Sequence, residues 1–153
     1  MGKSLKNRGF TLVEMMVVVT FVGLLATIML ASYRSTIKKS RDNRRIADVT
    51  SIKQAANMYA DRTGTFPSTG GGTVCSYTGG GGSCAPGACS GGGAINSWTA
   101  LSNTLVDFIN LTELKDPQLG SANRCYRYRS GGGNCQITYY SETAGGDTTI
   151  TCK

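Results

Sequence analysis

Histidine is absent from the 153 residues of the chain, and proline, tryptophan and charged residues are scarce. Without imidazole the chain has neither a Ser/His nor a Cys/His catalytic pair, and it has no histidine-bound metal. The three prolines all lie at or beyond position 67, so none of them interrupts a helix before that point. We therefore expect no enzymatic activity, no catalytic residue, no metal and no cofactor.

The net charge of +7 is unevenly distributed along the chain. Residues 1–9 contain three basic residues, and residues 34–62 contain eight basic residues against three aspartates. Residues 63–153 contain five residues of each sign, so this half of the chain is neutral. A neutral C-terminal half argues against a nucleic-acid partner, because phosphate binding requires a basic surface.

A 22-residue apolar run extends from position 10 to position 31, and its only charged residue is Glu14. A helix of this length is ~33 Å long, enough to cross a hydrocarbon core of about 30 Å. The run is longer than the apolar part of a secretory signal, which is roughly 7–15 residues. It is a candidate membrane-spanning helix.

The carboxylate of Glu14 needs a cationic partner, because a charge inside a spanning helix is costly and marks a functional site. If the chain is cut after Gly9, the new amino group of Phe10 lies one helical turn from Glu14. That amine is better placed for the Glu14 of a neighbouring copy. The pairing would neutralise both charges and fix the stagger between adjacent helices.

The sequence GFTLVE at 9–14, after a short basic leader and before an apolar helix, resembles the N-terminus of type IV pilins and type II secretion pseudopilins. The resemblance implies that a prepilin peptidase cuts after Gly9 and methylates the amine of Phe10. It also implies that Phe10 and Glu14 act in assembly. Weaker similarity to major pseudopilins continues at 58–67 and 114–128.

After position 31 the apolar residues follow a helical period of three or four, as on one face of an amphipathic helix. This stripe comprises Ile37, Ile46, Val49, Ile52, Ala56, Tyr59 and Ala60. We expect one helix from 10 to 62, ended by Gly64 and Pro67. Six basic residues between 34 and 45 have two interpretations, a nucleic-acid patch or a solvated face, and we favour the solvated face.

The six cysteines all follow the helix, at Cys75, Cys84, Cys89, Cys125, Cys135 and Cys152. Disulfides and a metal site are the alternatives. No pair has C-x-x-C spacing, which favours three disulfides in an oxidising compartment over zinc or an iron–sulfur cluster. Three of the cysteines lie in the glycine-rich segment 70–93, which we expect to be a loop.

Three short segments, 125–129, 136–140 and 148–152, have the composition of strands separated by glycine-containing turns. If Tyr140 faces Asp147 across the second turn, Cys135 faces Cys152. The register therefore favours a Cys135–Cys152 disulfide and leaves Cys125 for a cysteine of the loop.

Apolar residues between 98 and 109 recur at helical spacing after Ser97, a good N-cap, and we expect them to be core. Major pseudopilins, by the resemblance, bind calcium in a C-terminal acidic loop. The corresponding turn here offers only Glu142 and Asp147, whereas calcium prefers 6–8 oxygen ligands. We expect no calcium and infer that disulfides fasten this turn instead.

The expected fold is α+β, a long N-terminal helix packed on a small antiparallel sheet head with disulfides. Its expected parts are a leader peptide at 1–9, a transmembrane and polymerisation half at 10–31, an amphipathic half at 32–63 and a disulfide-rich head at 64–153. The alternatives left open are a membrane-anchored thiol protein and a DNA-capturing minor pilin or competence pseudopilin that uses Arg124, Arg127 and Arg129 with nearby tyrosines.

The expected function is a structural subunit that polymerises into a type IV pilus or pseudopilus. The expected partners are other copies in a helical fibre, inner-membrane lipid before assembly, prepilin peptidase and the pilus or secretion assembly machinery, and we do not expect nucleic acid. The expected location is a single-pass membrane protein with its head outside the cytoplasm, and then an extracellular or periplasmic fibre.

Overall fold

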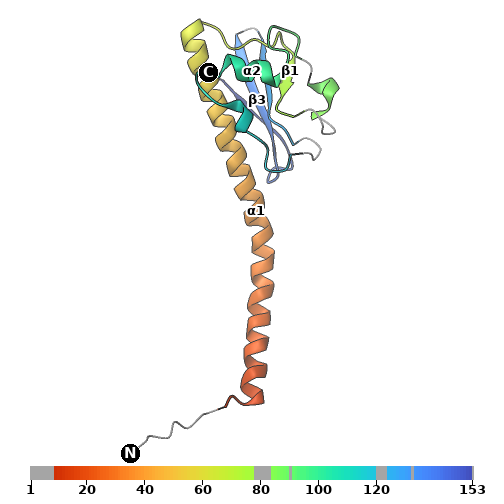
Figure 1. The fold of residues 1–153 in the computed structure, drawn as a ribbon. Coiled ribbons are helices and arrows are strands. Elements are labelled where there is room, and N and C mark those ends of the chain that lie inside the picture. The colour runs from red at the N-terminus through yellow and green to blue at the C-terminus, as the bar shows by residue number, and fades with distance from the viewer. Residues whose placement is uncertain (1–8, 78–83, 90, 120–123, 132, 153) are drawn as a thin grey trace, which may run out of the picture. The chain divides into compact units, whose positions relative to one another are not determined.

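The computed structural model describes residues 9–77, 84–89, 91–119, 124–131 and 133–152. The chain divides into two compact units, Met1–Ile37 and Lys38–Lys153. The expected α+β fold is confirmed, with a long N-terminal helix and a small antiparallel sheet (Figure 1).

The helix α1 runs without interruption over Leu12–Thr63, within two residues of the expected bounds. It ends where Gly64 takes a positive φ of 82° and its N–H donates to the carbonyl of Ala60 at 2.8 Å. A residue with a side chain would be strained in this conformation, so glycine terminates the helix cleanly. In the first unit, α1 is long and apolar enough to cross a membrane, as judged by length and composition.

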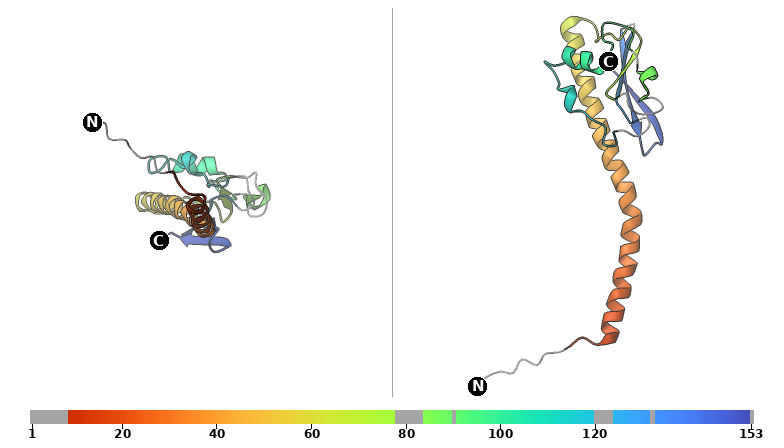
Figure 2. Two further views of the ribbon diagram at one scale, coloured as in Figure 1. Left: turned by 90° about the horizontal axis from the view of Figure 1, so that it is seen from below. Right: turned by 45° about the vertical axis from the view of Figure 1, so that its right-hand side comes forward.

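The second unit contains a four-stranded antiparallel sheet in the order β1-β2-β3-β4. The bounds are Thr73–Cys75 for β1, Arg127–Gly131 for β2, Asn134–Ser141 for β3 and Gly146–Thr151 for β4. The strands lie beside the part of α1 that belongs to this unit (Figure 2).

The pairing of β3 with β4 has the expected register, with Tyr140 opposite Asp147. Two other expectations about the sheet were wrong. Residues 73–75, assigned to a loop, form β1 because their backbone completes the edge of β2, with Val74 opposite Tyr128. Cys125 and Tyr126, assigned to a strand, precede β2.

Three short helices lie between β1 and β2 in the chain. The helix α2 spans Trp98–Thr104 and begins at the expected N-cap, where the Ser97 hydroxyl accepts from the N–H of Ala100 at 3.2 Å. The 3₁₀ helices η2 and η3 span Pro86–Ala88 and Leu111–Glu113. The expected core residues of this segment do pack in the core, Leu101 and Leu105 fully and Trp98, Phe108 and Ile109 partly.

The core of the second unit forms where one face of α1 meets the inner face of the sheet and α2. Its buried members on α1 are Val49, Ile52, Ala55 and Ala56. Ile46, expected on this stripe, is 43% exposed, because Asp42 and Arg45 occupy the buried face one turn before Val49. From its N-terminal to its C-terminal side, the buried face of α1 in this unit therefore changes from ionic to apolar.

Candidate functional site

The predicted cleavage junction lies immediately before α1. Gly9 and Phe10 are exposed and outside regular secondary structure, and Phe10 is 79% exposed. A Cβ built on Gly9 would meet nothing within 4 Å, so the structure places no neighbouring atoms over this peptide bond. The junction is sterically accessible.

Thr11 and Glu14 form a capping box at the start of α1. The carboxylate Oε2 of Glu14 accepts from the backbone N–H and from the hydroxyl of Thr11, both at 2.8 Å, and the Glu14 N–H donates to the Thr11 hydroxyl at 3.3 Å. This reciprocal bonding satisfies donors that the first helical turn leaves unpaired. Sequence reasoning missed it, although T-x-x-E before an apolar run is its signature.

The capping box occupies only one oxygen of the Glu14 carboxylate. Oε1 makes no hydrogen bond or ion pair with the residues that the structure describes. A carboxylate provides about four acceptor positions, so Glu14 retains the capacity to accept from a further donor.

The apolar side chains of the first unit are exposed along the whole of the segment. Large apolar residues from Phe10 to Leu30 are between 46% and 79% exposed. Within this chain the described residues provide no covering for them. The segment is therefore built for contact with lipid or with another protein surface.

In the second unit, a buried ionic network joins α1 to two distant segments. The guanidinium of Arg45 is fully buried and binds both oxygens of Asp116, with Nε at 2.7 Å and Nη2 at 2.9 Å. Its Nη1 donates to Asp42 at 2.9 Å and to Glu142 at 2.8 Å. Burial lowers the pKa of Arg45, because it disfavours the charged guanidinium. The hydrogen bonds to Asp116 and Glu142 outweigh burial, so the pKa of Arg45 is raised above its ordinary value.

Asp42 binds the turn between β3 and β4 directly. Its carboxylate accepts from the N–H of Glu142 at 2.9 Å, the N–H of Thr143 at 2.8 Å and the hydroxyl of Ser141 at 3.0 Å. Burial raises the pKa of this carboxyl, but the hydrogen bonds from Thr143, Glu142 and Ser141 outweigh burial and lower the pKa below its ordinary value. Asp42 is therefore ionised at neutral pH.

The network corrects two expectations. Arg45 belongs to the basic cluster assigned to a solvated face, yet it is buried among three carboxylates. The β3–β4 turn was expected to be held in place by disulfides. In the structure, Asp42 and Arg45 also bind this turn. Sequence periodicity could not reveal this, because the partners of Arg45 lie 71 and 97 residues away.

The two carboxylates considered for calcium are both bound to arginines. Glu142 accepts from Arg41 at 2.9 Å as well as from Arg45, and Asp147 pairs with Arg127 at 2.7 Å. Among the described residues, no group of three or more His, Cys, Asp or Glu is placed to bind a metal ion. Arginine therefore neutralises this turn in the structure.

All six cysteines form disulfides, in the pairs Cys75–Cys89, Cys84–Cys125 and Cys135–Cys152. The pairing predicted from the strand register is confirmed, as is the assignment of Cys125 to a cysteine of the loop. The first two disulfides attach the glycine-rich segment to β1 and to the residues before β2. No cysteine is left as a free thiol, which the alternative of a membrane-anchored thiol protein requires.

The tyrosines considered for stacking on DNA are buried. Tyr126 and Tyr128 are 0% exposed, and their hydroxyls donate to Asp48 and to the carbonyl of Pro67. Burial raises the pKa of both phenols, and for Tyr126 the hydrogen bond to Asp48 adds to this effect. Neither ring is available to a base, so the DNA-capture hypothesis loses its stacking element.

Two of the three arginines of that hypothesis are also engaged within the chain. Arg124 lies over the ring of Tyr140, with 3.9 Å from its guanidinium carbon to the ring centroid, and Arg127 pairs with Asp147. Arg129 remains exposed on the outer face of the sheet.

Comparison with known proteins gives one family model and several curated relatives that match part of the chain. Residues 4–30 match a family model described as the prokaryotic N-terminal methylation motif. Type II secretion system core protein G of Pectobacterium carotovorum is 33% identical over 64 residues, which are 42% of this chain and 41% of that protein. The same protein of Vibrio cholerae is 32% identical over 69 residues, 45% of this chain and 47% of the relative.

A fimbrial protein of Pseudomonas aeruginosa is 37% identical over 50 residues, 33% of this chain and 32% of the relative. The chain thus spans less than half the length of each of these curated relatives. No solved structure matches it at a significant level. The family model covers the segment that carries the predicted cleavage junction and Glu14.

Proposed function

Because the chain belongs to the pilin and pseudopilin family through its N-terminal segment, we propose that it is a structural subunit that polymerises into a pilus or pseudopilus fibre. The observation that carries this proposal is the exposed apolar segment from Phe10 to Leu30, which lies within the matched methylation motif. The fibre forms as the α1 segments of many copies pack against one another.

The cost of exposing this segment to water supports the proposal. Fourteen large apolar side chains between Leu12 and Leu30 are about half exposed or more. At ~1.5 kcal/mol for each buried side chain, leaving them in water would cost on the order of 20 kcal/mol. The segment therefore stays in lipid until it transfers to an equally apolar bundle of its own kind.

Processing prepares the segment for assembly. Prepilin peptidase removes residues 1–9 by cutting after Gly9 and methylates the amine of Phe10. Residues 10–31 then form the membrane and polymerisation half of the helix, residues 32–63 its amphipathic half, and residues 64–153 the head. The exposure of the junction is consistent with access by a peptidase.

Glu14 fixes the register of the fibre. Its Oε2 is occupied by Thr11 of its own chain, and its Oε1 accepts from the Phe10 amine of a neighbouring copy. In an apolar bundle this ion pair is little screened, so it favours one axial stagger over the others.

The subunit is a membrane-anchored protein before assembly, with its head outside the cytoplasm. Three disulfides support this orientation, because disulfides persist in oxidising compartments. The assembly machinery of a pilus or secretion system then extracts the subunit into a periplasmic or extracellular fibre.

The proposal is tested by Glu14→Gln and Glu14→Ala in cells that have the peptidase and the assembly machinery. Both variants should be cleaved and inserted normally but yield at least about tenfold less sheared fibre, a loss of ~1.4 kcal/mol per contact or more. Fibre yield is measured by immunoblotting of the sheared fraction.

Thr11→Ala is the matched control, because it removes the capping box and leaves the carboxylate. It should cost about 1 kcal/mol of helix stability and retain most of the fibre. Normal fibres from Glu14→Gln would contradict the ion pair, and an equal loss in Thr11→Ala would assign the effect to capping.

A further inference from the structure

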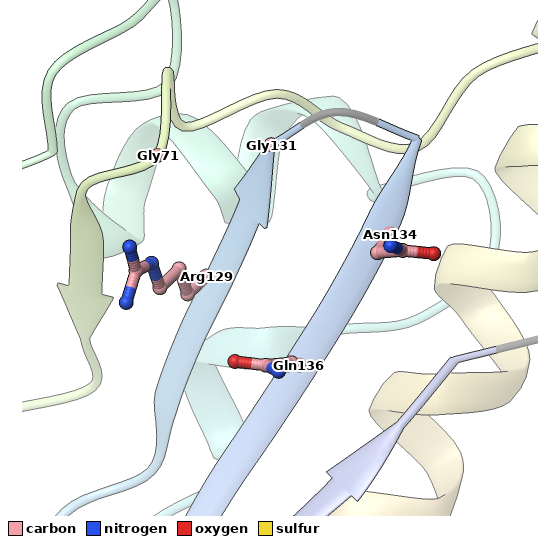
Figure 3. Close-up of a pocket in the computed structure, with 5 residues that line it drawn as sticks. All are labelled: Gly71, Arg129, Gly131, Asn134 and Gln136. Carbon is pink, nitrogen blue, oxygen red and sulfur yellow. The ribbon is translucent and has the colours of Figure 1, made fainter.

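A polar hollow lies on the outer face of the sheet, beside the turn between β2 and β3. It has a volume of about 430 Å³ and is lined by Gly71, Arg129, Gly131, Asn134 and Gln136 (Figure 3). Arg129 and Gln136 are directly opposite each other on β2 and β3, so their side chains share this face. The lining combines one cation with two amides.

The glycines keep the hollow open. Gly71 has a positive φ of 81°, and a Cβ on Gly131 would lie 3.2 Å from the Cα of Gly71. A larger residue at Gly131 would press on the backbone of Gly71. The space beside the Arg129 side chain is therefore not filled by the chain's own side chains.

Arg129 differs from the arginines around it. Arg124 and Arg127 contact carboxylates of the same chain, whereas Arg129 makes no hydrogen bond or ion pair with any residue that the structure describes. Figure 3 shows the Arg129 guanidinium on the β1 side of β2, with Gln136 and Asn134 on β3. A guanidinium in a lining without an aromatic ring fits a carboxylate, which it can bind through two parallel hydrogen bonds.

The second unit also contains a carboxylate without a partner. Asp61 is exposed in the last turn of α1 and makes no hydrogen bond or ion pair with the described residues. Every other carboxylate described in this unit contacts a donor of the same chain. The C-terminal end of a helix disfavours negative charge, so Asp61 destabilises the isolated chain and would be relieved by an external cation.

We propose that the hollow around Arg129 receives the Asp61 carboxylate of a second copy, an inference that rests on the proposed fibre. Copies in a helical fibre meet through two different surfaces of the same chain, so these surfaces must be complementary. Arg129 and Asp61 are opposite charges, both exposed, and neither has a hydrogen-bond or ion-pair partner among the described residues of its own chain. The contact joins the sheet face of one head to the end of α1 in another.

The test is a charge exchange in the full-length chain, expressed in cells that assemble fibres. Arg129→Asp and Asp61→Arg should each lower the yield of sheared fibre at least tenfold. The double variant, Arg129→Asp with Asp61→Arg, should recover to within threefold of the unchanged protein. Recovery requires folded subunits, so it excludes misfolding as the cause of the single losses.

Arg44→Asp is the matched control, because it makes the same charge change at an exposed position of α1. It should keep its yield within threefold. Normal fibres from either single variant, or a double variant no better than the singles, would overturn the contact. The other possible occupant is an external acidic ligand, tested with polygalacturonate, a polysaccharide that carries carboxylates. Normal fibres combined with loss of polygalacturonate binding in Arg129→Asp would also overturn the contact, and would assign the hollow to such a ligand. If the unchanged chain forms no fibres, the fibre proposal fails and this contact fails with it.

Discussion

Glu14 and Arg45 are both ionic residues on the single helix α1, yet their surroundings in the chain are opposite. Arg45 is buried with three carboxylates of its own chain. Glu14 is exposed among apolar side chains and, among the described residues, bonds only to Thr11. The second unit pairs the buried charge of Arg45 internally, whereas the first unit has an acid that retains acceptor capacity.

The apolar residues of the two regions differ in the same way. Ile52 is 0% exposed in the core of the second unit, while Leu25, on the same helix, is 57% exposed. Similar side chains therefore stabilise the folded head in one region and, in the proposed function, the lipid or fibre environment in the other. Stability of the head and assembly of the fibre should be separable by mutation.

The largest expected effect on the head comes from Arg45→Ala. It removes the guanidinium shared by Asp42, Asp116 and Glu142 and leaves the buried Asp116 without a cation, which should lower the free energy of unfolding by about 3–5 kcal/mol. Thermal unfolding of the detergent-solubilised full chain, followed by circular dichroism, measures this loss. Arg44→Ala, one position away and exposed, should change stability by less than about 0.5 kcal/mol. Equal effects at the two positions would mean that the network does not stabilise the head.

Core truncation should separate the two regions of α1. Ile52→Ala should destabilise the head by about 2–5 kcal/mol, because it leaves a cavity between α1 and the sheet. Leu25→Ala should leave the unfolding midpoint of the head within about 2 °C, corresponding to ~0.5 kcal/mol or less. The same unfolding measurement compares both variants. A head destabilised by Leu25→Ala would show that the regions are coupled.

The smallest expected effect is the acid sensitivity of the turn bound by Asp42. Its pKa in the folded chain is lowered from the ordinary 3.8, so its contribution is complete above about pH 4 and is lost as pH falls through the folded value. The stability difference between the unchanged chain and Asp42→Asn should therefore be about 1–3 kcal/mol at pH 7 and should shrink below pH 4. Urea unfolding at pH 7, 4 and 2.5 measures it. A difference independent of pH would contradict the role of the carboxylate.

Much of the fold was predictable from local pattern. The long helix followed from the absence of proline before position 67, and its end from Gly64. The β3–β4 register, and with it Cys135–Cys152, followed from one turn between two short strands. These features depend on residues close together in the sequence.

The features that were missed depend on distant residues or on charged residues in buried positions. The strand β1 exists because β2, more than 50 residues away, pairs with it. Arg45 was assigned to solvent because its partners Asp116 and Glu142 come together only in the folded head. Ile46 was assigned to the core because an apolar stripe was assumed to continue where the buried face is ionic.

The candidate site was only partly predictable. From GFTLVE the sequence predicts the junction and a role for Glu14, and both stay predictions. The bond between Thr11 and Glu14 was overlooked in favour of an intermolecular partner. The structure gives Glu14 an internal contact through Oε2, and among the described residues Oε1 has no partner. The internal contact is local, whereas the proposed role of Oε1 depends on a second copy.

Mass spectrometry and electron microscopy of the sheared material from producing cells measure the central claim most directly. The account predicts filaments whose subunit begins at a methylated Phe10 and has lost its first nine residues. A subunit that keeps those nine residues and remains a monomer in the membrane fraction would contradict it.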